Sequence, residues 1–190
     1  KQLADRGLMY RGYKSVPYCP RCGTGLSSHE VALGYREIED ASLHFLCPWL
    51  SSDGTPDPEG RAFVVWTTTP WTVPSNTGLA VHPDLTYVEV RHDGRLVVLA
   101  EERVEAVFGA DAQVERRYMG SELAGRRYAR ALDLIPMPDE PGNGWTVILE
   151  DFVSSEDGSG IVHLAPAFGS DDYAAGQRHG LPMLRPIDEA

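Results

Sequence analysis

The feature that most constrains this fold is a hairpin signature near the middle of the chain. Two apolar runs, residues 87–91 and 95–100, flank the turn His92-Asp93-Gly94. Asp-Gly between two such runs favours the tight turns that join antiparallel strands, because both residues tolerate positive φ. The chain therefore contains an antiparallel sheet, and other short apolar runs on both sides are candidates for its remaining strands.

Further strand patterns are short, apolar and rich in β-branched residues, and they cover residues 62–67, 77–81, 146–153 and 160–165. Residues 31–50 are mostly extended by pattern, and residues 51–60 form a loop by composition. Short helices are predicted at 101–108, closed by Gly109, and at 170–179, closed by Gly180, with Ser170 or Asp171 as the N-cap of the second. Many short strands with few helices predict a β-rich α+β domain, a partly closed β-barrel with short peripheral helices.

Composition narrows the class of protein. The chain has 190 residues, a net charge of -11 and only three cysteines. Three cysteines make no disulfide framework, so we expect a cytoplasmic protein, and no apolar run is long enough for a membrane span. The acidic balance argues against a typical nucleic-acid-binding surface. One basic cluster is either a solvated face or a contact to nucleic-acid phosphates: Arg116, Arg117, Arg126, Arg127 and Arg130. Because the chain begins at Lys1 without an initiator Met and ends without a closing element, we expect a piece of a longer protein.

The first candidate site is the tract from Trp66 to Thr72, with the sequence Trp-Thr-Thr-Thr-Pro-Trp-Thr, at the exit of an apolar strand. Pro70 disfavours helix at Thr69, so the chain should turn there. Such a turn directs several hydroxyls and free backbone N–H groups to one place, which suits a ribose or an ester carbonyl. The alternative is that the threonines are there for β-propensity and the tryptophans for the core.

A second candidate is Gly160-Ile-Val-His163-Leu-Ala-Pro166, followed by Asp171 and Asp172. A strand-loop-helix link can bring His163 and Asp172 over one pocket. An aspartate in the first turn of a helix stays ionised readily and can bind an ammonium group. The alternatives are helix capping for Asp172 and a buried, satisfied histidine for His163.

Cys19-Pro20-Arg21-Cys22 is a Cys-x-x-Cys pair, which supplies half of a tetrahedral zinc site. A redox role needs a thioredoxin-like βαβ setting, which the surrounding sequence lacks. Cys47 is interpreted as a buried apolar residue. The sequence has neither a Gly-x-Ser-x-Gly elbow nor a Gly-x-x-x-x-Gly-Lys phosphate loop.

These stretches resemble the paired signatures of the editing domains of class I aminoacyl-tRNA synthetases. The threonine tract is similar to the isoleucyl version of a bacterial-type enzyme, because valyl and leucyl relatives typically carry Thr-Thr-Arg-Pro where this chain has Thr69. Residues 16–30 resemble the isoleucyl enzyme just before its editing insertion. The resemblance covers nearly the whole chain, although residues 101–145 carry no familiar motif.

The resemblance implies a connecting segment at 1–38 and an editing domain at 39–190 that hydrolyses valine from the isoleucine tRNA with a positioned water. Valyl-adenylate is a further candidate substrate. Asp172 is then expected to bind the α-amino group, while Thr67, Thr68, Thr69 and Thr72 line the site for the ribose and amino acid. Thr69 and His163 border the side-chain pocket, and Trp66 and Trp71 wall it.

The same resemblance implies no cofactor for editing. Zinc would bind through Cys19 and Cys22 with ligands outside this chain, and ATP would be used only by the absent catalytic domain. The expected partners are the tRNA 3′ end carrying valine and the rest of the synthetase, in a monomer without membrane contact. The alternatives are a valyl or leucyl editing domain, a non-catalytic module that binds the tRNA 3′ end, a zinc-knuckle RNA-binding module, and a free-standing deacylase.

Overall fold

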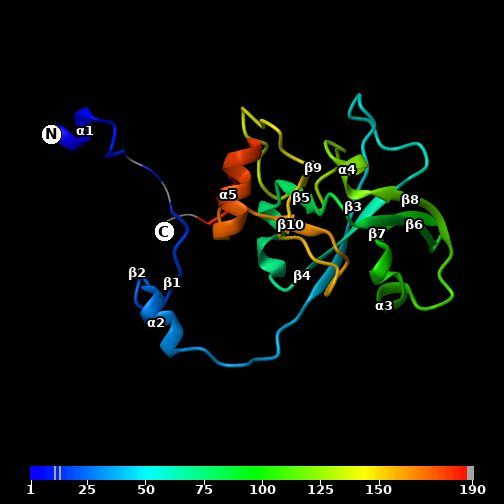
Figure 1. Cartoon of the computed structure of the whole chain (residues 1–190), viewed down its shortest axis with the longest axis horizontal. Helices are drawn as coiled ribbons and strands as arrows, with labels where there is room; N and C mark the ends of the chain where they lie inside the picture. The colour runs from blue at the N-terminus through cyan, green and yellow to red at the C-terminus, as the bar shows by residue number, and fades with distance from the viewer. Residues whose placement is uncertain (11, 13, 188–190) are drawn as a thin grey trace. The chain divides into compact units, whose positions relative to one another are not determined.

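The computed structural model of the chain describes residues 1–10, 12 and 14–187. The chain divides between Ile38 and Glu39 into two compact units, each described by itself (Figure 1). The first unit holds α1 (Gln2–Asp5), a two-stranded hairpin of β1 (Tyr18–Cys19) and β2 (Thr24–Gly25), and α2 (Ser28–Leu33).

Helix α2 corrects one expectation, since its last residues lie in the stretch 31–50 that was predicted to be extended. The helix forms because Ser27 and Glu30 make a capping box: the Ser27 hydroxyl accepts from the Glu30 backbone N–H, and the Glu30 carboxylate accepts from the Ser27 backbone N–H at 2.8 Å. Extended structure begins only at β3 (Leu43–Pro48).

The second unit is built on one curled sheet of eight strands among the described residues. Its path runs β8-β6-β7-β4-β10-β5-β9, and β3 pairs antiparallel with β4 off this path. The remaining strands are β4 (Ala62–Thr67), β5 (Gly78–Val81), β6 (Thr86–His92), β7 (Arg95–Ala100), β8 (Val114–Met119), β9 (Thr146–Leu149) and β10 (Val162–Leu164).

Short helices join and cover these strands, as predicted for a β-rich α+β domain. They are η1 (Pro70–Ser75), η2 (Glu101–Arg103), α3 (Val104–Phe108), α4 (Gly120–Leu123) and α5 (Ser170–His179). The predicted β6–β7 hairpin is confirmed, with Asp93 at φ 47° in its turn. Strand β9 is shorter than predicted, because the chain turns at Glu150.

The two ends of the sheet approach each other, which makes the barrel partly closed. After β8 the chain passes through α4, and residues 125–127 then hydrogen-bond to β9: Gly125 N–H donates to Val147 O at 2.8 Å, and Val147 N–H donates to Arg126 O at 2.9 Å. The backbone groups of the β9 edge are therefore paired instead of being left open.

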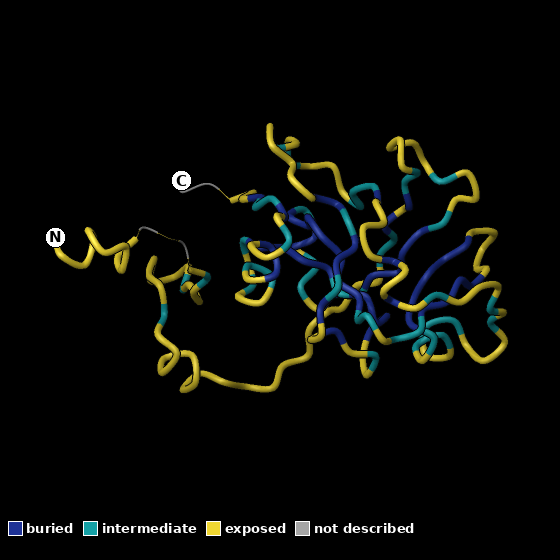
Figure 2. The backbone as a smooth tube through the Cα atoms, turned by 45° about the horizontal axis from the view of Figure 1, so that its top comes forward, coloured by how far each residue is buried: buried dark blue, intermediate teal, exposed yellow. Residues whose placement is uncertain are grey.

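Strand β4 is buried on both faces, which explains its unbroken apolar sequence. Phe63 and Val65 face the main core with Leu79 and Tyr87, whereas Val64 faces a smaller core on the other side of the sheet. Figure 2 shows the buried backbone concentrated in these strands. Among the described helices, none has the length and apolar character that a membrane crossing requires.

Candidate active site

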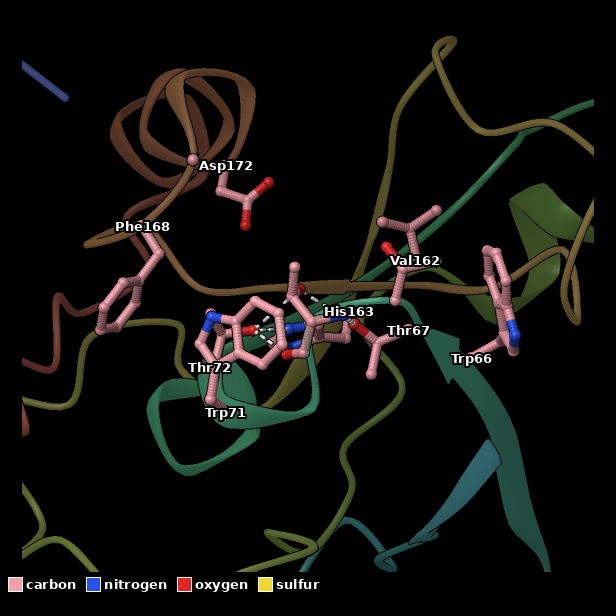
Figure 3. A pocket seen from close by; sticks show the side chains of 11 residues that line it. Trp66, Thr67, Trp71, Thr72, Val162, His163, Phe168 and Asp172 are labelled. Carbon is pink, nitrogen blue, oxygen red and sulfur yellow. Dashed lines mark hydrogen bonds between the residues drawn. The ribbon is translucent and has the colours of Figure 1, made fainter. Parts of the chain in front are cut away.

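Eight of the predicted site residues line a single cavity of about 430 Å³ in the second unit (Figure 3). The cavity lies where the end of β4, the turn η1, strand β10 and the start of α5 meet. Its lining consists of Trp66, Thr67, Thr68, Thr69, Trp71, Thr72, Val162, His163, Phe168, Gly169 and Asp172. None of the five clustered arginines belongs to this lining.

Sheet pairing places the two predicted motifs side by side. Strand β10 lies between β4 and β5: it runs parallel to β4 with Val162 opposite Trp66, and antiparallel to β5 with His163 opposite Leu79. The chain leaves β4 at Thr67 and turns directly into η1 at Pro70. The threonine turn therefore closes over the middle of β10.

The hydroxyls of three threonines form a connected chain inside the turn. The Thr69 N–H donates to Thr67 Oγ1 at 3.0 Å, and the Thr69 hydroxyl oxygen lies 3.1 Å from that of Thr67 and 3.2 Å from that of Thr72. The Thr72 hydroxyl donates to Thr69 O at 2.8 Å. Thr67 and Thr72 are buried, and Thr68 is exposed at the mouth. The turn is thus rigid and polar on its cavity side.

His163 is buried in the floor of the cavity with 7% of its surface exposed. Its Nε2 lies 2.8 Å from Thr72 Oγ1, and its Nδ1 lies 3.2 Å from Asn76 Nδ2. Burial lowers the pKa of His163 to about 4, so the ring is neutral at physiological pH. A neutral, doubly hydrogen-bonded imidazole can shape and polarise the site but carries no charge into it.

Asp172 extends from the first turn of α5 toward the cavity, as Figure 3 shows. Its Oδ2 accepts from the Ala165 N–H at 2.8 Å, which ties the carboxylate to the loop between β10 and α5. Burial raises the pKa of Asp172 above its ordinary value, and the Ala165 N–H opposes that effect. A half-buried carboxylate of this kind suits a ligand that brings a positive charge.

The predicted capping of α5 is wrong. The N-cap is Gly169, and neither Ser170 nor Asp171 makes a side-chain cap. A glycine is needed there because a Cβ on Gly169 would lie 2.9 Å from Asp172 Cγ. The side chain of Asp172 is directed to Ala165 and the cavity instead of serving as the cap.

Aromatic side chains form the walls of the cavity, and Figure 3 shows Phe168 and Trp66 on opposite sides. Trp71 is 60% exposed at the mouth. Trp66 packs over Gly158, whose Cα is so close that an added Cβ would lie 2.5 Å from the indole ring. Phe168, Val162 and Gly169 were not predicted, because nothing in their local sequence distinguishes them from loop and strand residues.

Asn76 was also missed, although it connects the cavity to the core. Its Nδ2 donates to Gly78 O at 2.9 Å, and its Oδ1 accepts from the Tyr128 hydroxyl at 2.7 Å. The Trp145 indole N–H donates to Asn76 O at 3.0 Å. Tyr128 and Trp145 lie in the stretch 101–145 that carried no motif, so only the folded structure reveals this link.

Cys19 and Cys22 lie in the first unit, Cys19 at the end of β1 and Cys22 in the turn that leads to β2, and both are free thiols. The backbone N–H and the thiol of Cys22 hold the pKa of Cys19 below its ordinary value, which favours a thiolate. Two sulfurs fit the donor preference of zinc. No group of three or more metal-ligand side chains is present among the described residues, so the pair alone does not complete a tetrahedral site.

Comparison with known sequences gives a consistent result. The chain is 44% identical over 189 residues to the isoleucine–tRNA ligase of Thermoplasma volcanium, and 45% identical over 189 residues to that of Thermus thermophilus. These matches cover 100% of this chain but only 17% and 18% of the relatives, so the chain spans about a sixth of their length. No family model matches the sequence.

Comparison with solved structures concerns the fold. The crystal structure of GlLeuRS-CP1 superposes with a TM-score of 0.58 at 15% identity, over 79% of this chain and 70% of that one. The editing domain of the P. knowlesi cytosolic leucyl-tRNA synthetase superposes with a TM-score of 0.57 at 11% identity, over 74% and 63%. The β-rich, partly closed barrel is therefore the fold of these domains.

Proposed function

Because this chain belongs to the isoleucine–tRNA ligase family, we propose that residues 39–190 act as the editing domain of such an enzyme. The proposed reaction is hydrolysis of the ester that joins a wrongly attached valine to the terminal adenosine of the isoleucine tRNA. The observation that carries the proposal is one cavity in which a half-buried carboxylate, a rigid threonine turn and a neutral histidine meet.

Asp172 is proposed to bind the α-amino group of the amino acid. An aminoacyl ester carries an ammonium group, and a carboxylate fixed by the Ala165 N–H at 2.8 Å offers it a charge-assisted hydrogen bond. Binding of that charge offsets the burial that raises the pKa of Asp172. The carboxylate thus selects a charged amino acid and fixes the position of the adjacent ester.

The threonine turn is proposed to hold the ribose and the ester while a water attacks. The described lining of the cavity contains no cysteine and no serine. Cys47 lies in the core, where burial raises its pKa to about 12. Orientation of the ester and the water by Asp172 and the hydroxyls would therefore supply the acceleration, without a covalent intermediate.

His163 and Thr69 are proposed to border the space for the amino acid side chain, with Trp66 and Trp71 as walls. One methylene in an apolar pocket is worth only about 1–3 kcal/mol, a limit for which isoleucyl-tRNA synthetases are the established example. A second site that admits valine and excludes isoleucine by size corrects the resulting errors. Because the floor at His163 is buried and doubly hydrogen-bonded, it yields little to a larger side chain.

The proposed setting follows the same family. The partners are the 3′ end of isoleucine tRNA and the rest of the synthetase, in a cytoplasmic monomer. ATP belongs to the catalytic domain and valyl-adenylate is a further substrate. Zinc would be held by Cys19 and Cys22 together with ligands from elsewhere in the enzyme.

The test is release of valine and of isoleucine from isoleucine tRNA by the full chain, with Asp172→Asn as the variant. Asn keeps an acceptor for the Ala165 N–H, and loss of a charge-assisted bond of about 3 kcal/mol predicts a fall of about 100-fold in kcat/KM for valine release. Asp171→Asn is the matched control, because Asp171 is the exposed neighbour on the same helical turn. It should keep wild-type activity.

Stability separates the two possible roles of Asp172. A first-turn carboxylate contributes at most about 1 kcal/mol to a helix, so both variants should unfold close to wild type. An Asp172→Asn chain that releases valine normally would refute the amino-group assignment. A folded wild-type chain that releases neither amino acid, even in excess over the tRNA, would favour a module that only binds the 3′ end.

A further inference from the structure

The hydrogen bonds beneath the cavity determine which ring nitrogen of His163 carries the proton. Asn76 Nδ2 is within reach of both Gly78 O, at 2.9 Å, and His163 Nδ1, at 3.2 Å. A carbonyl oxygen can only accept, so the Asn76 amide must present its NH₂ group, and not its oxygen, to Gly78 O. The same NH₂ group then donates to Nδ1, which is therefore the unprotonated nitrogen of the neutral ring, and Nε2 carries the hydrogen.

Two aromatic residues hold Asn76 in this orientation. The Tyr128 hydroxyl, fully buried, donates to Asn76 Oδ1 at 2.7 Å, and the Trp145 indole donates to Asn76 O at 3.0 Å. The Trp145 backbone N–H donates to Thr77 O at 2.7 Å, so Trp145 is bonded to the two successive carbonyl groups of Asn76 and Thr77. Trp145 adopts φ 57°, which costs an L-residue about 1–2 kcal/mol and shows how strongly the surrounding contacts determine this arrangement.

The proton on Nε2 sets the direction of the hydroxyl chain above it. His163 Nε2–H donates to Thr72 Oγ1 at 2.8 Å, and the Thr72 hydroxyl donates to Thr69 O at 2.8 Å. Thr72 has then used its only proton, so the 3.2 Å contact between the two hydroxyls requires Thr69 to donate to Thr72. By the same reasoning Thr67 donates to Thr69 across 3.1 Å.

We infer that Asn76, held by Tyr128, is a positioning residue that fixes His163 as a hydrogen-bond donor and so leaves the hydroxyl oxygens of Thr67 and Thr69 as acceptors toward the ligand. Thr72 is saturated, because it donates to Thr69 O and accepts from both His163 and Thr69. Because Nε2 already carries a proton, His163 cannot take one from Thr72, which excludes a threonine–histidine nucleophilic pair despite the 2.8 Å contact. Acceptors in the turn orient the hydrogens of the attacking water or of a ribose hydroxyl. Donors for the developing oxyanion must then come from outside this chain of hydroxyls, from the Thr68 hydroxyl or from backbone N–H groups.

The tautomer can be read directly by ¹⁵N NMR of the full chain labelled in its histidine rings, without any substrate. The His163 signals are assigned by their disappearance in His163→Gln. A pyrrole-like Nε2 and a pyridine-like Nδ1 are expected in the wild type, and the opposite pattern would overturn the inference. Asn76→Asp places a carboxylate opposite Nδ1 and should move the proton to that nitrogen. A folded variant in which His163 keeps its proton on Nε2 would contradict the positioning role of Asn76.

Kinetics then test the consequence for the reaction, a part that rests on the proposed function. Tyr128→Phe keeps the aromatic packing and removes one buried hydrogen bond, so kcat for valine release should fall on the order of tenfold with KM little changed. Tyr118→Phe, which removes a hydroxyl bonded to Glu89 away from the cavity, is the matched control and should keep the wild-type kcat.

The NMR measurement of the tautomer and the kinetics of valine release test the two proposals independently. If the wild-type chain releases no valine, the proposed function fails, while the ring tautomer still decides whether Asn76 fixes the proton of His163 on Nε2. If valine is released and Tyr128→Phe and Asn76→Asp match the wild type, the positioning role is refuted. If Asn76→Asp does not fold, the wild-type tautomer and Tyr128→Phe still decide.

Discussion

Replacing His163 by glutamine isolates how strongly a buried, titrating ring couples the stability of the second unit to pH. Burial lowers the pKa of His163 from 6.5 to about 4. Between these pH values His163 is protonated in the unfolded chain but not in the folded chain. The free energy of unfolding therefore decreases as pH falls through this window. Above pH 6.5 the ring is neutral in both states and this cost is absent.

The size of this loss of stability follows from the difference between the pKa values of His163 in the unfolded and folded chains. A tenfold change in proton affinity corresponds to about 1.4 kcal/mol, so the fall from 6.5 to about 4 amounts to about 3 kcal/mol. The ring is only 7% exposed, so solvent screening does not reduce this estimate much. Glutamine does not titrate, and its amide can still donate toward Thr72. The wild type should therefore lose about 3 kcal/mol more than His163→Gln between pH 7 and pH 4.

Urea unfolding followed by tryptophan fluorescence measures this difference. The four tryptophans, at 49, 66, 71 and 145, all lie in the second unit, so the signal reports on that unit alone. Other groups titrate in the same range, and comparing the two proteins at each pH cancels their contribution. His92→Gln, at an exposed histidine in the β6–β7 hairpin, controls for the loss of one histidine. Parallel stability profiles of wild type and His163→Gln would refute the reasoning.

Two further predictions concern Gly158 and the cysteine pair. Gly158→Ala places a Cβ 2.5 Å from the Trp66 ring at φ 64°, whereas Gly60→Ala meets open space at φ 66°. Urea unfolding should show that Gly158→Ala is less stable than Gly60→Ala by about 1–3 kcal/mol. Equal losses of stability in the two variants would mean that Trp66 moves aside. Because Cys19 and Cys22 supply only two sulfurs, the full chain should bind zinc weakly, and removing the zinc with a chelator should leave urea unfolding of the second unit unchanged. Cys19→Ser should abolish the binding in equilibrium dialysis. Tight zinc binding by Cys19→Ser would contradict the assignment.

The parts of the fold that were predictable are those with strong local signals. Residues 62–67 and 170–179 were predicted with the bounds of β4 and α5, because an unbroken apolar run and a closing glycine mark them. Strand β8 was missed because it lies at the edge of the sheet, where Glu115, Arg116 and Arg117 are exposed and hide any apolar pattern. Helix α2 was missed because its six residues include no buried side chain.

The site residues also divide into those with a local sequence signal and those without one. The threonine tract and the pair His163 and Asp172 were found because unusual residue types cluster at short spacing, and they do line one cavity. Asn76 and Tyr128 lie 52 residues apart and meet through one hydrogen bond. A single asparagine or tyrosine in an ordinary sequence carries no signal of such a pairing, so the support of the cavity could only be found in three dimensions.

The central place of β10 in the sheet has a consequence for the order in which the molecule folds. Thr72 and His163 are 91 residues apart in the chain and 2.8 Å apart in space. Closing so long a loop is entropically costly, and non-local strand pairing of this kind forms late. During synthesis, every strand from β3 to β9 emerges from the ribosome before β10. The cavity is thus completed only after β10 and then α5, which carries Asp172, have been synthesised, and a nascent chain that can already form much of the sheet still lacks it.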